Sequence, residues 1–102
     1  MSDWKKLCPL DEIPPLGSRV VASQHGDIAI FRLANDEVFA IHDKCPHKGG
    51  PLSQGIVSGK IVTCPLHGQK IDLETGEAVA PDTGCTPPFS VKRVGDDVWI
   101  AL

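Results

Sequence analysis

The sequence predicts an all-β fold in one domain. Nine prolines and ten glycines punctuate short apolar runs, which is the pattern of strands joined by turns. A chain of 102 residues has the length of a single domain, here residues 1–102. Eight segments rich in apolar and β-branched residues are expected to be strands: Trp4–Cys8, Arg19–Ser23, Asp27–Leu33, Val38–His42, Lys60–Cys64, Lys70–Leu73, Phe89–Val94 and Val98–Leu102.

Polar turn sequences separate several of these strands. Asn35-Asp36-Glu37 predicts a hairpin between its two neighbours, and Glu74-Thr75-Gly76 and Gly95-Asp96-Asp97 mark two further turns. The one indication of helix is a short stretch near Asp11–Ile13, which Pro14-Pro15 would end at once.

The middle of the chain has a different character. Glycine and proline are frequent between residues 45 and 68, and only short strands are expected there. We therefore interpret residues of about 44–72 as a loop-rich insert, mounted on a β-scaffold that both flanks build. Loops held by a rigid scaffold commonly carry function, so candidate functional residues are sought in this insert.

Composition excludes several function classes. The net charge of −3 and the pI of about 5.7 do not fit nucleic-acid binding, which needs a clustered basic excess. No apolar run approaches the roughly 18 residues of a membrane span, and no apolar stretch follows the first lysines as it would in a secretory signal. A cytoplasmic protein without nucleic-acid or membrane partners is expected.

Two segments of the insert share a pattern of possible metal ligands. They are Cys45-Pro46-His47-Lys48-Gly49-Gly50 and Cys64-Pro65-Leu66-His67-Gly68, with 16 residues between His47 and Cys64. A proline after each cysteine favours an extended cysteine, and the glycines can adopt positive φ close to a bulky centre. Buried cysteine and histidine residues without a metal would not explain this double pairing. The candidate metal ligands are thus Cys45, His47, Cys64 and His67.

Two metal centres compete for such a ligand set. Zinc accepts two cysteines and two histidines in a tetrahedral site, and a zinc-stabilised interaction module is one alternative. Zinc sites of that type usually pair cysteine with cysteine and histidine with histidine, whereas each segment here mixes the two. A pair of irons separates ligands by softness, with both thiolates on one iron and both imidazoles on the other. The pattern favours a [2Fe–2S] cluster.

The spacing Cys-x-His, 16 residues, Cys-x-x-His resembles the Rieske family, and the likeness covers nearly the whole chain. It implies a Rieske-type antiparallel β-sandwich or barrel with a small cluster-binding subdomain inserted in the base domain. It also implies that Cys45 and Cys64 bind the inner iron and that His47 and His67 bind the outer, more exposed iron. The segment Leu52–Gly55 is similar to the one that packs beside the family's cluster.

Departures from the family pattern indicate the low-potential branch. High-potential members join the two loops by a disulfide, but Gly50 and Leu66 occupy the matching positions. Their serine and tyrosine donors to the cluster are missing too, since Gln69 follows the second loop and the chain has no tyrosine. Two neutral imidazoles still make the oxidised site easier to reduce than four thiolates would. Metal-bound imidazoles also predict a potential that falls as pH rises.

Within the family, the chain is most similar to the small subunit of bacterial NAD(P)H-dependent nitrite reductase. The similarity runs through His42–Gly55, Ile71–Ala78 and Pro81–Cys85. It implies a large catalytic partner with FAD, a [4Fe–4S] cluster and sirohaem, which reduces nitrite to ammonium. The chain has no G-x-G-x-x-G nucleotide fingerprint, so no complete catalytic site is expected on it alone.

The alternative within the family is the ferredoxin component of an aromatic-ring-hydroxylating dioxygenase. Such ferredoxins share the ligands, but they usually have phenylalanine where Ile71 stands and lack the Gly84-Cys85 pair.

The remaining residues of chemical interest have simpler interpretations. Cys8 and Cys85 are expected to be structural or free thiols, His25 a solvated turn residue and His42 a packing support. Lys44 and Lys48 are solvated or face an acidic partner, and Trp4 and Trp99 are expected in the core.

Overall fold

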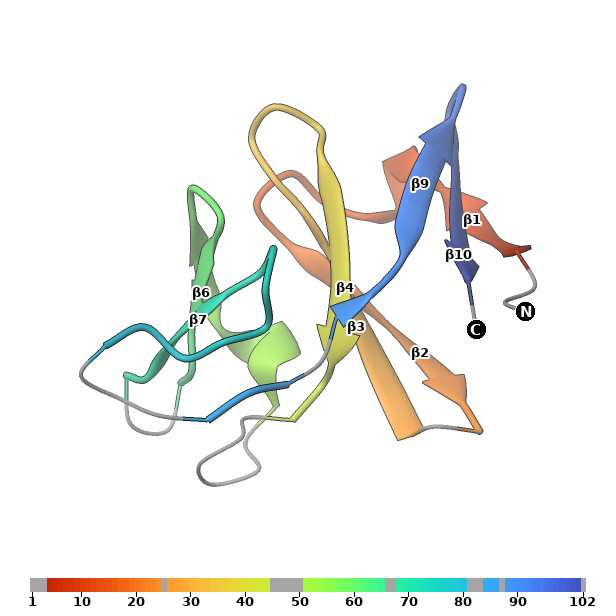
Figure 1. Cartoon of the computed structure of the whole chain (residues 1–102). Helices are drawn as coiled ribbons and strands as arrows, with labels where there is room; N and C mark the ends of the chain where they lie inside the picture. Colours follow the sequence, from red (N-terminus) through yellow and green to blue (C-terminus); the bar gives the residue numbers. More distant parts are fainter. Residues whose placement is uncertain are drawn as a thin grey trace.

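The computed structural model describes residues 4–24, 26–44, 51–65, 68–80, 84–86 and 88–101. Within these residues the chain forms three antiparallel sheets and two short 3₁₀ turns (Figure 1). This β-rich architecture confirms the predicted all-β class. No helix of the described residues is long and apolar enough to cross a membrane.

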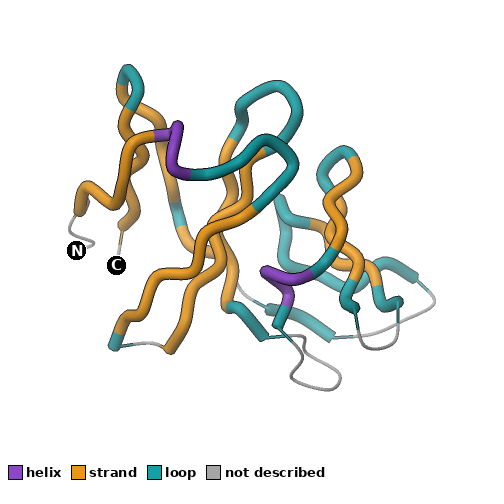
Figure 2. Tube along the Cα trace, turned by 180° about the vertical axis from the view of Figure 1, so that it is seen from behind, coloured by secondary structure: helices purple, strands orange, loops and turns teal. Residues whose placement is uncertain are grey.

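Each sheet is built from a different part of the chain. The first sheet has the order β1 (Trp4–Pro9), β10 (Asp97–Ala101), β9 (Val91–Val94). The second has the order β2 (Ser18–Ser23), β3 (Gly26–Arg32), β4 (Val38–His42), β8 (Pro88–Phe89). The third has the order β5 (Ile56–Ser58), β6 (Ile61–Thr63), β7 (Lys70–Asp72). The 3₁₀ turns are η1 (Leu10–Glu12) and η2 (Leu52–Gln54), and η2 lies beside the third sheet (Figure 2).

The predicted strand Phe89–Val94 is divided in the structure. Phe89 pairs with Ala40 in the second sheet, whereas Val91 pairs with Ile100 in the first. Ser90 lies at the switch, and its carbonyl accepts a hydrogen bond from the backbone of Ala101 at 2.9 Å. The break allows one segment to serve two sheets, a topology that the apolar pattern alone does not reveal.

The central sheet separates two apolar cores. Along β3, Ile28 and Ile30 face a core shared with the first sheet, while Ala29 and Phe31 face a core shared with the third sheet. All four side chains are buried, which explains why β3 shows no alternation of apolar and polar residues. The third sheet is therefore fixed to the scaffold through buried side chains.

The prediction that Trp4 packs in the core is wrong. Its side chain is 41% exposed, and the ammonium of Lys92 lies 4.2 Å from the centre of its ring. Val98 and Ile100 supply the core face of β10, so Trp99 between them points to the other face and is only partly buried. Smaller aliphatic residues fill this core instead.

Candidate metal centre

One of the four predicted ligands, Cys64, lies within the described residues. Cys45, His47 and His67 lie outside them. In the ranges that the structure describes, no three His, Cys, Asp or Glu residues form a group able to hold a metal. The complete ligand set thus stays a prediction. The structure shows how described residues at the ends of the two Cys–His segments are attached to the sheets.

Cys64 follows the last residue of β6 and is buried. Its exposed fraction is 1%, and it belongs to the core between the second and third sheets. A tight turn begins at Cys64: its carbonyl accepts a hydrogen bond from the backbone N–H of Gly68 at 3.0 Å, and its own N–H donates to the carbonyl of Gln69 at 2.7 Å. Gly68 has φ +69°, a conformation that glycine adopts at little cost. These two hydrogen bonds join the described residues on both sides of Leu66 and His67.

A second arrangement closes the first Cys–His segment. The Ser53 backbone N–H donates to Oδ1 of Asp43 at 2.6 Å, and the Ser53 hydroxyl donates to Oδ2 at 2.9 Å. The Ser18 hydroxyl donates to the Ser53 carbonyl at 2.8 Å, and the Asp43 backbone N–H donates to the carbonyl of Asp27 at 2.9 Å. We call these contacts the Asp43–Ser53 bracket. Residues 44–52 therefore begin and end on one hydrogen-bonded pair attached to β2 and β3.

Sequence reasoning missed the bracket. The sequence pattern places Ser53 in a segment beside the cluster, but it gives Asp43 no role. A usable signal was present, because a carboxylate and a hydroxyl residue flank the cysteine–histidine segment on its two sides.

The segment that leaves the first loop packs against the strand that leads to the second. Leu52 is fully buried in the same core as Cys64. At Gly55 a Cβ would overlap the carbonyl oxygen of Thr63 and approach Cγ2 of Val62 to 2.9 Å. Glycine is thus required for this close approach. It brings the end of the first loop next to the residue that precedes Cys64.

This environment fits a thiolate-bound iron. A metal ion stabilises the thiolate form of a cysteine that is buried in an apolar core. Sulfur is a soft donor that suits iron–sulfur centres. The buried position of Cys64, at the start of a turn that also contains His67 in the sequence, is suitable for a cluster ligand.

The other two described cysteines lie in different surroundings. Cys8 is buried in the core of the first and second sheets, and burial raises the pKa of its thiol. Cys85 is exposed and forms an isolated bridge with Glu77, next to a hydrogen bond from the Ala78 N–H to the carbonyl of Gly84 at 2.9 Å. Neither belongs to the core that contains Cys64, which agrees with their interpretation as structural or free thiols.

Two of the remaining candidates are described. The ring of His42 packs edge-to-face on Phe89 with centroids 4.9 Å apart, as expected of a packing support. Lys44 is exposed. His25 and Lys48 lie outside the described residues.

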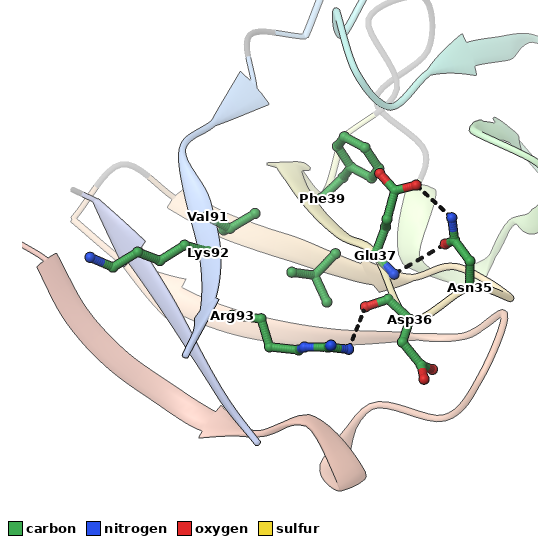
Figure 3. Close-up of a pocket in the computed structure, with 8 residues that line it drawn as sticks. Asn35, Asp36, Glu37, Phe39, Val91, Lys92 and Arg93 are labelled. Atoms are coloured by element: carbon green, nitrogen blue, oxygen red, sulfur yellow. Dashed lines mark hydrogen bonds between the residues drawn. The ribbon is translucent and has the colours of Figure 1, made fainter. Parts of the chain in front are cut away.

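A surface depression of about 390 Å³ lies between the β3–β4 turn and β9 (Figure 3). Asn35 and Glu37 hydrogen-bond to each other, and Arg93 donates to the carbonyl of Asp36 at 3.3 Å. The lining polar groups named here are thus engaged with one another. The depression does not include Cys64, and its contacts offer no group for redox chemistry.

Comparison with known proteins places this geometry in a family. Residues 3–101 match the model of the Rieske-like [2Fe–2S] domain. The anthranilate 1,2-dioxygenase ferredoxin subunit of Burkholderia cepacia is 38% identical over 101 residues, which cover 98% of this chain and 93% of that protein.

Two solved structures share the fold. One is a candidate NADH-dependent nitrite reductase small subunit from Mycobacterium tuberculosis, with a TM-score of 0.89 and 24% identity, covering 100% of this chain and 96% of that one. The other is a candidate small subunit of an NADPH nitrite reductase, with a TM-score of 0.86 and 26% identity, covering 96% of this chain and 97% of that one. The match to the family model extends over nearly the whole chain, and the β-fold agrees with it. The chain belongs to the Rieske-like [2Fe–2S] family, carries a [2Fe–2S] cluster and transfers electrons as part of an oxidoreductase system.

Proposed function

We propose that Cys45, His47, Cys64 and His67 hold the cluster, with both thiolates on one iron and both imidazoles on the other. The observation that supports this ligand set is the position of Cys64, buried at the start of a tight turn beside the segment that leaves the first loop. Residues of about 44–72 then form the cluster-binding part of the single domain. The Asp43–Ser53 bracket ties one side of this part to the scaffold, and the core around Leu52 and Cys64 ties the other.

When bound, the cluster accepts and releases one electron at a time. The chain's own residues keep the sulfur ligand Cys64 out of water, and two backbone hydrogen bonds tie Cys64 to Gly68 and Gln69. A buried, preorganised ligand reduces the structural change that accompanies each change of charge. Hydrogen bonding and exclusion of water around the sulfur atoms also tune the reduction potential.

We propose that this chain is the small subunit of an assimilatory NAD(P)H nitrite reductase. Its partner is a large subunit with FAD, a [4Fe–4S] cluster and sirohaem, and the location is the cytoplasm. Ile71 and the Gly84-Cys85 pair support this assignment, as does the 26% identity to a candidate nitrite reductase small subunit. Ile71 is fully buried in the same core as Cys64, and the carbonyl of Gly84 accepts a hydrogen bond from the Ala78 N–H. Of these features, Ile71 belongs to the core, whereas Gly84 and Cys85 are exposed.

A second candidate is the ferredoxin of a ring-hydroxylating dioxygenase. The 38% identity to the anthranilate dioxygenase ferredoxin subunit favours it. In that case the partner would be a terminal oxygenase. The two candidates share the cluster and the electron transfer, and they differ in the protein that receives the electron.

A mixing experiment distinguishes the candidates. The chain with its cluster is incubated with the sirohaem large subunit of the same organism and, separately, with a terminal oxygenase of that organism. The nitrite reductase assignment predicts that the chain forms a stable complex with the sirohaem subunit and restores ammonium formation by it, and that the chain has no effect on the oxygenase. Stimulation of the oxygenase, with no effect on the sirohaem subunit, would instead establish the dioxygenase assignment.

A ligand exchange tests whether the cluster relays electrons or only stabilises the subunit. His67→Cys keeps a ligand but adds a thiolate charge, which should lower the potential. If the cluster relays electrons, turnover of the partner enzyme should slow in proportion to the drop in reduction potential. Unchanged turnover with a lowered potential would indicate a scaffold.

A further inference from the structure

Asp43 places a charged side chain beside the first Cys–His segment. It stands two residues before the proposed ligand Cys45, and two residues of chain span at most about 7 Å between Cα atoms. On the other side of the Asp43–Ser53 bracket, Ser53 follows Leu52, which is buried in the same core as Cys64. The carboxylate is thus close to both segments that provide sulfur ligands.

The carboxylate of Asp43 is held by neutral donors. Oδ1 accepts a hydrogen bond from the Ser53 backbone N–H at 2.6 Å, and Oδ2 accepts one from the Ser53 hydroxyl at 2.9 Å. Among the residues that the structure describes, no ion pair involves Asp43, whereas the carboxylate of Asp36 lies 2.9 Å from the guanidinium of Arg32. The two contacts therefore fix the negative charge of Asp43 in position without neutralising it.

The surroundings of this charge are partly closed to water. Asp43 and Ser53 are both half-buried. The Ser18 hydroxyl of β2 donates to the Ser53 carbonyl at 2.8 Å, and the Asp43 N–H donates to the carbonyl of Asp27 at 2.9 Å, so the second sheet holds both ends of the bracket. Water and salt screen a partly buried charge less than an exposed one. The field of the Asp43 carboxylate consequently extends to a neighbouring cluster.

A nearby negative charge opposes reduction of the cluster. With two thiolates and two neutral imidazoles the oxidised site is neutral, and the added electron gives the reduced site one negative charge. A fixed carboxylate repels that charge, which lowers the reduction potential. The departures from the high-potential sequence pattern predict a low potential because hydrogen-bond donors and a disulfide are missing. The Asp43 carboxylate is a separate physical cause that acts in the same direction.

We propose that the carboxylate of Asp43 is a tuning charge that lowers the reduction potential of the cluster, and that Ser53 holds it in position. The inference rests on the ligand set proposed above, because Cys45 is what brings the cluster to Asp43. Tuning differs from closing the loop: hydrogen bonds alone can close the loop, whereas tuning requires the charge. The two roles can therefore be separated by substitution.

The test measures the reduction potential of the complete chain with its cluster by voltammetry at neutral pH. Electron paramagnetic resonance of the reduced protein shows for each variant whether the cluster is intact. Asp43→Asn removes the charge but keeps a side chain of the same shape that can still bond to Ser53. Asp43→Glu and Asp43→Gln form a second pair of equal shape that differs in charge, and this pair decides the question if Asp43→Asn binds the cluster poorly.

Two controls separate the charge from its hydrogen bonds and from the net charge of the chain. Ser53→Ala keeps the carboxylate and removes one hydrogen bond to it. Asp96→Asn removes a carboxylate that is exposed in the turn between β9 and β10, in the first sheet. Both variants should have reduction potentials close to that of the parent chain.

Asp43→Asn should favour the reduced state about tenfold relative to the parent chain. This is the order of magnitude for one charge about 10 Å away at an effective dielectric constant of about 20, and it corresponds to an upward shift of about 59 mV for a one-electron couple. The potential of Asp43→Gln should likewise lie above that of Asp43→Glu.

Three results would overturn the tuning charge in proteins with an intact cluster. The first is an unchanged potential in Asp43→Asn or equal potentials in the Glu and Gln variants. The second is an equal shift in Ser53→Ala, which would assign the effect to loop geometry. The third is an equal shift in Asp96→Asn, which would assign it to net charge. A Rieske signal that survives Cys45→Ala would instead overturn the proposed ligand set, so the two failures are distinguishable.

Discussion

Removal of the Ser53 hydroxyl should loosen the first loop and accelerate loss of the cluster. In Ser53→Ala the hydrogen bond from Oγ to the Asp43 carboxylate disappears, while the backbone N–H of residue 53 keeps its bond to the other carboxylate oxygen. A hydrogen bond to a charged group contributes about 1.5–3 kcal/mol. The bracket is partly buried, so we take the lower end of that range. A loss of about 1.5 kcal/mol corresponds to a change of roughly tenfold in an equilibrium constant, here that of loop opening.

The assay follows the visible absorbance of the cluster after addition of an iron chelator. Ser53→Ala should release iron about tenfold faster than the parent chain, because the chelator reaches the cluster through the opened loop. Asp43→Ala removes both acceptors and should be faster still. Ser23→Ala is the matched control: it deletes an exposed hydroxyl that bonds to the Gly26 carbonyl in the β2–β3 turn. Equal release rates for Ser53→Ala and Ser23→Ala would refute the view that the bracket secures the loop.

Two further predictions concern close packing and thiol chemistry. Gly55→Ala should destabilise the fold, because its Cβ would overlap β6. Gly59→Ala has open space around its Cβ and costs only the strain of its positive φ. In thermal unfolding, Gly55→Ala should therefore have the lower melting temperature of the two. Burial raises the pKa of the Cys8 thiol, so above about pH 8.5 the unfolded chain ionises this group before the folded chain does, and stability should fall as pH rises through that range. The stability of Cys8→Ala should decline less steeply with pH, and a stability difference from the parent that does not change with pH would contradict this. Iodoacetamide should label exposed Cys85 before Cys8 in the folded protein.

Local patterns predicted most of the strands. The apolar segments around β3 and β4 and the turn between them are where the composition placed them, since β-branched residues and a polar turn act within a few residues of each other. β5 was not predicted, because three residues between glycines give too little pattern and the strand depends on pairing with β6. The switch at Ser90 and the exposure of Trp4 also depend on which sheet a segment joins.

In the candidate site, too, local sequence patterns predict some features, while others depend on contacts between residues distant in the sequence. Cysteine and histidine spacing predicts the ligand types, because metal coordination constrains which residues occur close together in the chain. The Asp43–Ser53 bracket joins residues on opposite sides of a loop. Such contacts appear only when the register of the sheets is known. The anchoring of the loops therefore required the structure.

The central claim is that this chain holds a Rieske cluster on two cysteines and two histidines. The most direct test is iron and acid-labile sulfide analysis, with electron paramagnetic resonance of the reduced protein, for alanine variants of Cys45, His47, Cys64 and His67 and for Cys8→Ala and Cys85→Ala. The account predicts two irons and two sulfides per chain in the parent and in the last two variants, and loss of the Rieske signal in each of the first four. A colourless parent protein containing zinc, or an unchanged signal in any of those four variants, would contradict it.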